Sequence, residues 1–407
     1  MSSPLGSAVP AGLQTGGHPP GNRTLVAVLA VTQTIGYGAL YYAFAVFLTP
    51  TATDLHTSTT AVTGAYTASI LTSAALAIPI GRRLDRHGGR ALMTGGSLLG
   101  TVLLIAWSQI DQVWQLYAVQ IGIGIASAAS LYEAAFAVII TWYRPERRSA
   151  ALLALTVVAG FASTIFLPLT GWLVAAHGWR TALLVLAAIH AVTVPLHATV
   201  VRRPTGARLD SVTEHDAARS LRTAVSDRGF WLLAAGFTAH TAASSTYSVL
   251  LIAALIALGH PPAFAATIAG LLGVLSVTGR LITTGLQRRY STTTITAVVF
   301  AVQAAAALLL PAIGAGAGGA IIAVVGFGLG FGVATIAKPV ILAERYDTRR
   351  YATLAGILVA PTTLAKAGAP LAAAALYATT GSYTPVLIAV AACCGVAATA
   401  IAACSRR

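Results

Sequence analysis

The sequence predicts an all-α membrane protein in which twelve transmembrane helices form two pseudo-symmetric six-helix bundles. Three observations lead to this fold class. Hydrophobic residues make up 57% of the chain and charged residues only 9%, whereas soluble domains carry about a quarter charged residues. Apolar runs of membrane length recur along the whole chain, and the basic residues gather at alternate connections between these runs.

Each apolar run is long enough to cross a hydrocarbon core of about 30 Å as a helix that rises about 1.5 Å per residue. Six runs occupy the first half of the chain, at residues 24–49, 60–80, 91–109, 113–142, 149–176 and 181–201. Six more occupy the second half, at residues 230–258, 263–285, 293–313, 318–343, 351–378 and 384–404. The lipid bilayer is therefore the expected surroundings of most of the chain.

The basic residues indicate how the helices are oriented in the membrane. Of the 25 lysines and arginines, 21 lie in the two termini and in the even-numbered connections, whereas the odd-numbered connections carry only Arg180. Connections rich in Lys and Arg stay on the cytoplasmic side. We therefore expect a multi-pass protein of the cytoplasmic membrane with both termini inside. The net charge of +14 then requires no nucleic-acid partner.

Two segments lie outside the predicted helices. Residues 1–23 are rich in Gly and Pro and lack the features of a signal peptide, so we expect a disordered cytoplasmic tail. Residues 202–229 are polar and charged, and we expect a cytoplasmic linker between an N-terminal bundle, residues 24–201, and a C-terminal bundle, residues 230–407. The three cysteines have no spacing typical of disulfide frameworks or metal sites, and we expect no metal and no cofactor.

Sequence similarity between the two halves supports the two-bundle arrangement. WYRPERRSAALLA, at the end of the fourth run, aligns with ERYDTRRYATLAG at the end of the tenth, which pairs Arg148 with Arg350. The same offset pairs Pro168 with Pro370. Parallel six-helix repeats with a substrate site between the halves at the membrane midplane are the arrangement of one large class of transporters.

The connection between the second and third runs, GRRLDRHGGR, combines glycines, an aspartate and arginines. Glycine at position 81 allows two helices to pack closely, Gly88 allows a tight turn, and arginines such as Arg86 and Arg90 hold the loop at the cytoplasmic face. The spacing resembles the signature loop of the major facilitator superfamily.

In that superfamily the loop aspartate lies against the N-terminus of the eleventh helix, where unpaired N–H groups and the helix dipole favour a negative charge. The resemblance implies that Asp85 lies near residues 351–353. It also implies that the loop acts as a conformational latch.

Other stretches resemble one branch of this superfamily, the oxalate/formate antiporters and monocarboxylate transporters. These stretches are GYGALYYAFAVFLTP in the first run, WYRPERRSAALLAL, and GWLVAAHGWR. In that branch an arginine of the eighth span and, in the oxalate type, a lysine of the eleventh bind substrate carboxylates. The resemblance implies these roles for Arg280 in TGRLI and Lys366 in LAKAGAP.

Three basic residues, Arg280, Lys338 and Lys366, lie inside predicted spans. A basic residue at a helix centre costs about 2.5 to 3.5 kcal/mol on insertion scales, so it usually faces a cavity or a partner. Lys366 lies in the middle of its run. Arg280 and Lys338 lie nearer the cytoplasmic ends of theirs, and both are open to a second interpretation in which the side chain reaches the lipid headgroups.

Glu133 is the only acidic residue well inside a predicted span. It is a candidate for proton coupling, or alternatively an ion-pair partner that packs the fourth span against another helix. In the resembled superfamily the first, fourth, seventh and tenth helices line the central cavity. Tyr37, Tyr41, His240 and Tyr247 are therefore further candidates for substrate contacts, although such residues also occur in ordinary helix packing.

These features predict a secondary active transporter that moves a small organic anion, a mono- or dicarboxylate, by alternating access as a monomer, with protons as a candidate coupling ion. An enzyme would need a nucleophile or metal constellation, and the sequence offers neither. The alternative is a multidrug or metabolite efflux pump of the same superfamily. A site for cationic compounds would be expected to carry acidic residues, whereas three basic residues and one acidic residue lie inside the spans here.

Overall fold

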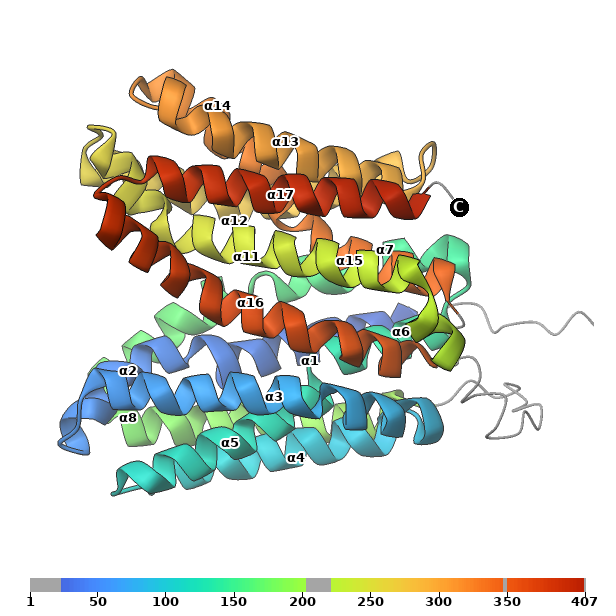
Figure 1. The fold of residues 1–407 in the computed structure, drawn as a ribbon. Helices are drawn as coiled ribbons and strands as arrows, with labels where there is room; N and C mark the ends of the chain where they lie inside the picture. The colour runs from blue at the N-terminus through green and yellow to red at the C-terminus, as the bar shows by residue number, and fades with distance from the viewer. Residues whose placement is uncertain (1–22, 203–220, 347–349, 406–407) are drawn as a thin grey trace, which may run out of the picture.

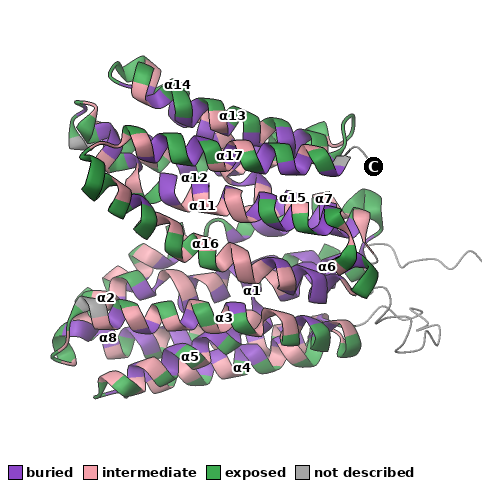
Figure 2. Ribbon diagram, viewed as in Figure 1, coloured by how far each residue is buried: buried purple, intermediate pink, exposed green. Residues whose placement is uncertain are grey.

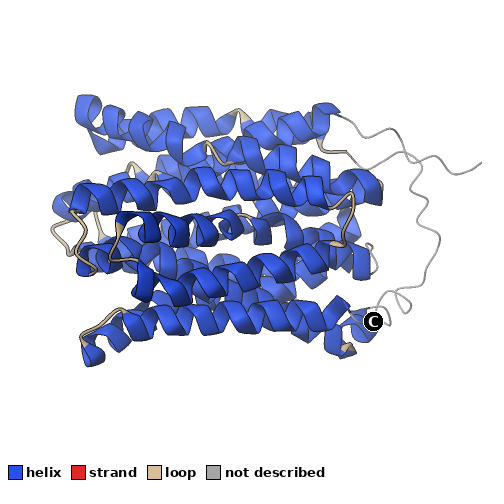
Figure 3. Cartoon of the chain, turned by 90° about the horizontal axis from the view of Figure 1, so that it is seen from above, coloured by secondary structure: helices blue, strands red, loops and turns tan. Residues whose placement is uncertain are grey.

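The structure, a computed structural model, describes residues 23–202, 221–346 and 350–405. Within these ranges the chain is helical and contains no strand (Figure 3). The expected tail, except for its last residue, and the central part of the expected linker, residues 203–220, lie outside the described residues.

The N-terminal half contains nine α-helices and one π-helix among the described residues: α1 (Arg23–Tyr37), η1 (Gly38–Tyr42), α2 (Phe44–Asp54), α3 (Thr59–His87), α4 (Gly89–Trp107), α5 (Val113–Ser130), α6 (Tyr132–Trp142), α7 (Pro145–Ala159), α8 (Ala162–Ala191) and α9 (Thr193–Val200). The C-terminal half contains α11 (Arg228–Ala257), α12 (Pro262–Leu286), α13 (Thr292–Ile313), α14 (Ala317–Phe331), α15 (Val333–Arg345), α16 (Tyr351–Thr380) and α17 (Thr384–Ser405). Every predicted span coincides with one helix or with consecutive helices.

Among the described residues, 11 helical segments are long and apolar enough to cross a membrane. One of them, residues 145–200, has 56 residues. A single crossing of the membrane needs only about 20 residues. Gly178 divides this segment, because its φ of 79° is not helical and is accessible mainly to glycine. The segment therefore makes two crossings, and the total agrees with the twelve predicted spans.

The ends of several helices follow from their sequences. Ser58 caps α3 by accepting a hydrogen bond from the N–H of Ala61, and Pro145 occupies the first turn of α7, where a missing N–H costs nothing. Gly88, with φ 77°, ends α3 and leads directly into α4. The tight turn predicted between the second and third spans is thus present.

The helices form two groups that lie side by side with their long axes roughly aligned (Figures 1 and 3). In Figure 1, α3, α4, α5 and α8 lie on one side, α11, α13, α14 and α17 lie on the other, and α1 and α16 run between them. We call the end at which α3 meets α4 and α15 precedes α16 the basic end, because most of the loop arginines lie there. The other end is called the distal end.

The apolar cores show how the two halves meet. At the basic end one core joins both halves, with Leu84 and Ile140 packed in the same cluster as Phe230, Leu342 and Leu354. Toward the distal end each half has a core of its own. One is built around Trp107 and the helices near it, and the other is built around Phe327. The halves are therefore closed together at the basic end and packed separately at the distal end.

Helix α16 shows the same difference along its own length (Figure 2). Its first six residues, 351–356, are all buried, but beyond residue 358 only Ala373 is buried. Leu364 and Leu371 are 61% and 72% exposed. Because a helix packed inside a bundle would bury one face along its whole length, the distal part of α16 is packed less closely against the other helices than its first turns are.

Candidate functional site

Two helix breaks, at corresponding positions of the two halves, position the charged side chains of Glu133 and Lys338. The fourth span breaks between α5 and α6 at Leu131, whose ψ of −160° is extended. The tenth breaks between α14 and α15 at Gly332, with ψ −10°. Glu133 lies in the first turn of α6, where the helix dipole favours a carboxylate. Lys338 lies in the second turn of α15.

Glu133 and Lys338 form an ion pair between the two halves. Lys338 Nζ donates to Glu133 Oε1 at 2.7 Å. Their side chains are 17% exposed for Lys338 and 34% for Glu133, so the pair is half-buried. The second carboxylate oxygen, Glu133 Oε2, is buried and accepts no hydrogen bond from any described residue. The ion-pair alternative considered for Glu133 is thus present, and its partner is Lys338.

Arg280, on α12, also crosses to the N-terminal half. Its Nη1 donates to the carbonyl oxygen of Thr156, on α7, at 2.9 Å, and its Nε donates to that of Gly332 at 3.3 Å. These carbonyls lie in the last turn of α7 and at the break before α15. A guanidinium has five N–H donors, so three remain available to another acceptor.

Lys366, on α16, faces the first span. Its Nζ donates to Tyr41 Oη at 2.9 Å and lies 5.1 Å from the centre of the Tyr41 ring. Tyr41 belongs to η1, the π-helix that separates α1 from α2, and π-helical turns of this kind are frequent at functional sites. Lys366 is exposed, like many residues in the distal part of α16.

A cluster of tyrosines lies between these charges. The ring of Tyr37 lies 4.4 Å from that of Tyr132 and 6.0 Å from that of Tyr41, and the ring of Tyr42 lies 5.1 Å from that of Tyr41. Tyr42 interacts electrostatically with both Lys366 and Arg280. We call Tyr37, Tyr41, Tyr42 and Tyr132 the tyrosine cluster.

His240 and Tyr247, also predicted as substrate contacts, lie elsewhere. His240 is 2% exposed, its Nε2 is 3.0 Å from Gln303 Oε1 on α13, and its ring stacks on Phe300. Tyr247 is 1% exposed and stacks on Phe327 of α14. The structure thus places both side chains inside the C-terminal bundle, apart from the tyrosine cluster.

The loop GRRLDRHGGR contacts the eleventh span where the resemblance implied. Asp85 Oδ1 accepts the N–H of Ala352 at 3.0 Å, and Oδ2 accepts the N–H and the hydroxyl of Thr353 at 2.9 and 2.6 Å. A Cβ on Gly81 would collide with the backbone of Ala352, so this glycine permits the close approach of α3 and α16.

The arginines of the loop lie at the basic end. Arg86 is in the last turn of α3. Arg90 donates through Nε to the carbonyl oxygen of Ala198, on α9, at 2.6 Å. The end of α9, which is short of donors, is thus tied to the beginning of α4.

Sequence reasoning missed three residues of this site. Tyr132 is next to Glu133 in sequence and could have been found from that position. Thr156 contributes only its backbone carbonyl, and a backbone contact cannot be predicted from the type of residue. Gln33, which is 0% exposed, donates to the carbonyl oxygen of Ser130 at the break before α6, at 2.8 Å. A glutamine inside an apolar span is a signal that such a carbonyl needs a partner.

The family model of the major facilitator superfamily matches residues 29–370, which is most of the chain. The protein belongs to the major facilitator superfamily. It is therefore a multi-pass membrane transporter rather than an enzyme. Members of this superfamily bind small substrates within the membrane and often use protons. The match concerns the superfamily as a whole, and the oxalate/formate and monocarboxylate branch remains a prediction.

Solved structures of superfamily members share this fold. The E. coli fucose:proton symporter superposes with a TM-score of 0.74 at 14% identity, covering 95% of this chain and 100% of that one. A bacterial homologue of the iron transporter ferroportin, in an outward-facing state, gives 0.74 at 18% identity, covering 94% and 99%. The proton:xylose symporter XylE gives 0.66 at 12% identity, covering 92% and 94%.

A curated relative resembles part of the chain more closely in sequence. An MFS-type efflux pump of Mycolicibacterium smegmatis is 31% identical over 178 residues, which are 43% of this chain and 41% of the pump. The chain thus matches less than half the length of that relative.

Proposed function

We propose that this superfamily member carries a small organic anion, a mono- or dicarboxylate, across the cytoplasmic membrane by alternating access. The observation that supports this most strongly is the distribution of partners among the embedded charges. Glu133 is neutralised by Lys338 at 2.7 Å. The hydrogen-bond partners of Arg280 are two backbone carbonyls, and that of Lys366 is a tyrosine hydroxyl. Two positive charges are therefore without a described counter-ion.

The arrangement suits a carboxylate physically. A charge in a partly desolvated site needs a partner of opposite sign, and an anion between Arg280 and Lys366 would supply it. The spare N–H groups of Arg280 match the two oxygens of a carboxylate, while Lys366 acts as a point charge. The Tyr42 hydroxyl, which interacts with both cations, would donate a further hydrogen bond.

Uptake into proteoliposomes of labelled mono- and dicarboxylates tests the proposal. We expect Arg280→Gln and Lys366→Gln each to weaken the binding of the transported carboxylate by about tenfold or more, because a hydrogen bond to a charged group contributes about 1.5 to 3 kcal/mol. Arg289→Gln is the matched control, since Arg289 is exposed beyond the end of α12. Equal carboxylate binding in all three variants would contradict the anion site.

We also propose a membrane orientation and a coupling ion. With the basic end in the cytoplasm, as the loop charges favour, the halves are closed on the inside, and the structure corresponds to an outward-open state. Glu133 is the candidate proton carrier. It would be ionised while paired with Lys338, and it would take up a proton when the substrate anion draws that lysine away. We expect the monomer to be the functional unit.

The second candidate function is efflux, and the similarity to a mycobacterial efflux pump over 178 residues favours it. Both functions use the same fold, so the charge of the substrate separates them. The test uses everted membrane vesicles with an acidic interior and measures the accumulation of a cationic dye. Accumulation by the wild type that is unchanged in Lys366→Gln would establish the efflux of cations. Dye accumulation equal to that of vesicles without the protein would exclude the efflux of cations.

A further inference from the structure

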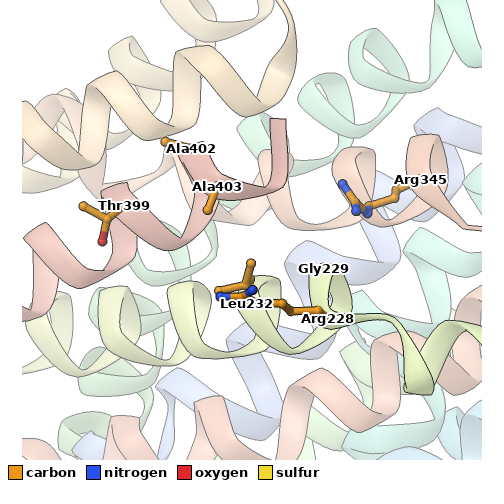
Figure 4. A pocket seen from close by; sticks show the side chains of 7 residues that line it. All are labelled: Arg228, Gly229, Leu232, Arg345, Thr399, Ala402 and Ala403. Carbon is orange, nitrogen blue, oxygen red and sulfur yellow. The ribbon is translucent and has the colours of Figure 1, made fainter. Parts of the chain in front are cut away.

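A hollow of about 380 Å³ lies at the basic end of the C-terminal half, away from the tyrosine cluster. Figure 4 shows the seven residues that line it, contributed by α11, α15 and α17: Arg228, Gly229, Leu232, Arg345, Thr399, Ala402 and Ala403. Its volume is within the range of sites for small ligands.

The charges at the hollow are positive on balance. Arg228 is exposed, and no described residue accepts a hydrogen bond from it. Arg345 is held in place, with Nη1 donating to the carbonyl of Cys404 at 2.6 Å and Nε and Nη2 each 3.4 Å from Asp227 Oδ2. Asp227 is itself bound by the Tyr346 hydroxyl at 2.7 Å. The carboxylate of Asp227 therefore offsets one of the two arginine charges, and Arg345 keeps two further N–H donors.

The lining of the hollow combines two arginines with apolar and small residues. Arg228 and Arg345 lie at the ends of α11 and α15, whereas Leu232 and Thr399 lie one or more turns inside α11 and α17. Trp231, next to Leu232, is 52% exposed, and exposed tryptophans are typical of the boundary between headgroups and acyl chains. The hollow thus offers two arginines and apolar surface close to the boundary of the membrane.

We propose that this hollow binds the headgroup phosphate of an anionic phospholipid of the inner leaflet. The phosphate accepts hydrogen bonds from Arg228 and from the free N–H groups of Arg345, and the first part of an acyl chain lies along Leu232 and Ala403. Basic pockets between helices on the cytoplasmic side are suited to such lipids, because an anionic leaflet attracts cations near its surface. A zwitterionic lipid carries a compensating positive charge and is bound less tightly.

Native mass spectrometry of the full-length protein, released from bilayers of mixed phosphatidylglycerol and phosphatidylcholine, tests the site. We expect the wild type to retain phosphatidylglycerol preferentially and Arg228→Gln to lower its retention about fivefold, the effect of one arginine close to an anionic surface. Arg289→Gln, an exposed arginine at the same end, is the matched control and should retain lipid as the wild type does. Leu232→Trp fills the hollow without removing a charge and should also reduce retention.

Two results would overturn the proposal. One is phosphatidylglycerol retention equal to wild type in both Arg228→Gln and Leu232→Trp. The other is displacement of the lipid by inorganic phosphate at millimolar concentration, which would identify a free phosphate as the ligand. Because Leu232→Trp leaves both arginines in place, a loss of lipid in that variant cannot be attributed to a general change in surface charge.

Discussion

At the scale of single residues, the partners of the embedded charges decide what each can do. Lys338 and Glu133 neutralise each other across the two halves, whereas Arg280 and Lys366 have neutral partners. The pair therefore links the halves, and the two other cations are those that we propose to bind the substrate. Breaking a partly buried pair by removing one charge is costly because the other is left without its partner.

We predict that Glu133→Gln abolishes accumulation driven by a proton gradient but leaves exchange at equal concentrations largely intact. Glutamine keeps the size of the side chain but cannot take up and release a proton. The measurement is labelled-substrate uptake into proteoliposomes with and without a pH gradient, and Glu146→Gln, an exposed carboxylate on α7, is the control. Gradient-driven accumulation at the wild-type level would leave Glu133 with a packing role alone.

The individual charges could be identified from sequence, but their partners could not. Hydropathy detects an embedded Glu133 or Lys338 because each interrupts an apolar run, yet two residues 205 positions apart are paired only by the fold. The burial of His240 and Tyr247 inside the C-terminal bundle could not be predicted from sequence either. Polar residues are spread around their helix, α11, so no polar stripe in the sequence indicates which face lies inside the bundle.

At the scale of helices, the contact of Asp85 with the start of α16 is the most specific link between the halves. The carboxylate accepts hydrogen bonds from two N–H groups that have no partner within the helix. We predict that Asp85→Asn weakens the closed basic end by about 1 kcal/mol, the usual contribution of such a helix cap. Transport should slow more than substrate binding weakens, and parallel measurements of rate and affinity check this.

A glycine substitution tests the same contact without changing charge. Gly81→Ala places a methyl group against the backbone of Ala352, whereas a Cβ on Gly95 of α4 would meet no atom within 4 Å. Gly95→Ala is therefore the control. If the two variants transport at the same rate, the close approach of α3 and α16 has no part in the transport cycle.

The cap of α11 gives a prediction about pH. The hydrogen bond from the Tyr346 hydroxyl and that from the Gly229 N–H, with the charge of Arg345, hold the pKa of Asp227 below its ordinary value. A lowered folded-state pKa contributes stability above about pH 4, the pKa of a free aspartate, and this contribution is lost as the pH falls through the folded value.

In thermal unfolding in detergent at neutral pH, we therefore expect a gap in melting temperature between the wild type and Asp227→Asn, with the wild type the more stable. The gap should narrow below about pH 4, where the wild-type carboxylate becomes protonated. A gap that stays constant across this range would show that the charge of Asp227 contributes nothing to stability.

Helix positions could be predicted from sequence more completely than helix breaks. The apolar runs predicted all twelve spans, because hydropathy shows which segments are apolar and long enough to cross the lipid bilayer. The breaks at Leu131 and Gly332 lie inside continuous apolar runs, and hydropathy carries no information on backbone torsion angles. The turn at Gly178 was anticipated, because polar residues interrupt the runs there.

At the scale of the whole molecule, the shared core at the basic end and the separate distal cores define two bodies that meet at one end. Alternating access requires the opposite arrangement as well, with the shared core opened and the distal parts brought together. The contacts that must break in that change are those of Asp85, of Arg280 with Thr156, and of the Glu133–Lys338 pair.

We predict that both termini and the connection at residues 202–228 are cytoplasmic. A cysteine introduced at Asp111, exposed at the distal end, should react with an impermeant maleimide in intact cells, and one introduced at Ser226, exposed at the basic end, only after the cells are permeabilised. The native cysteines are replaced by serine beforehand in both variants. The reverse labelling pattern would invert the orientation and, with it, the assignment of the open side.

Lys338 and Lys366 are the only lysines in the chain, and both lie at the candidate site. Amine-directed reagents, which modify dozens of surface positions on most proteins, would here modify this site and a terminal amine alone. Lys338 is 17% exposed and engaged with Glu133, while Lys366 is exposed beside Tyr41, so the two amines should differ in reactivity. Because the loops carry arginine in place of lysine, the reactivity of these two amines should report on the transport cycle without any engineered residue.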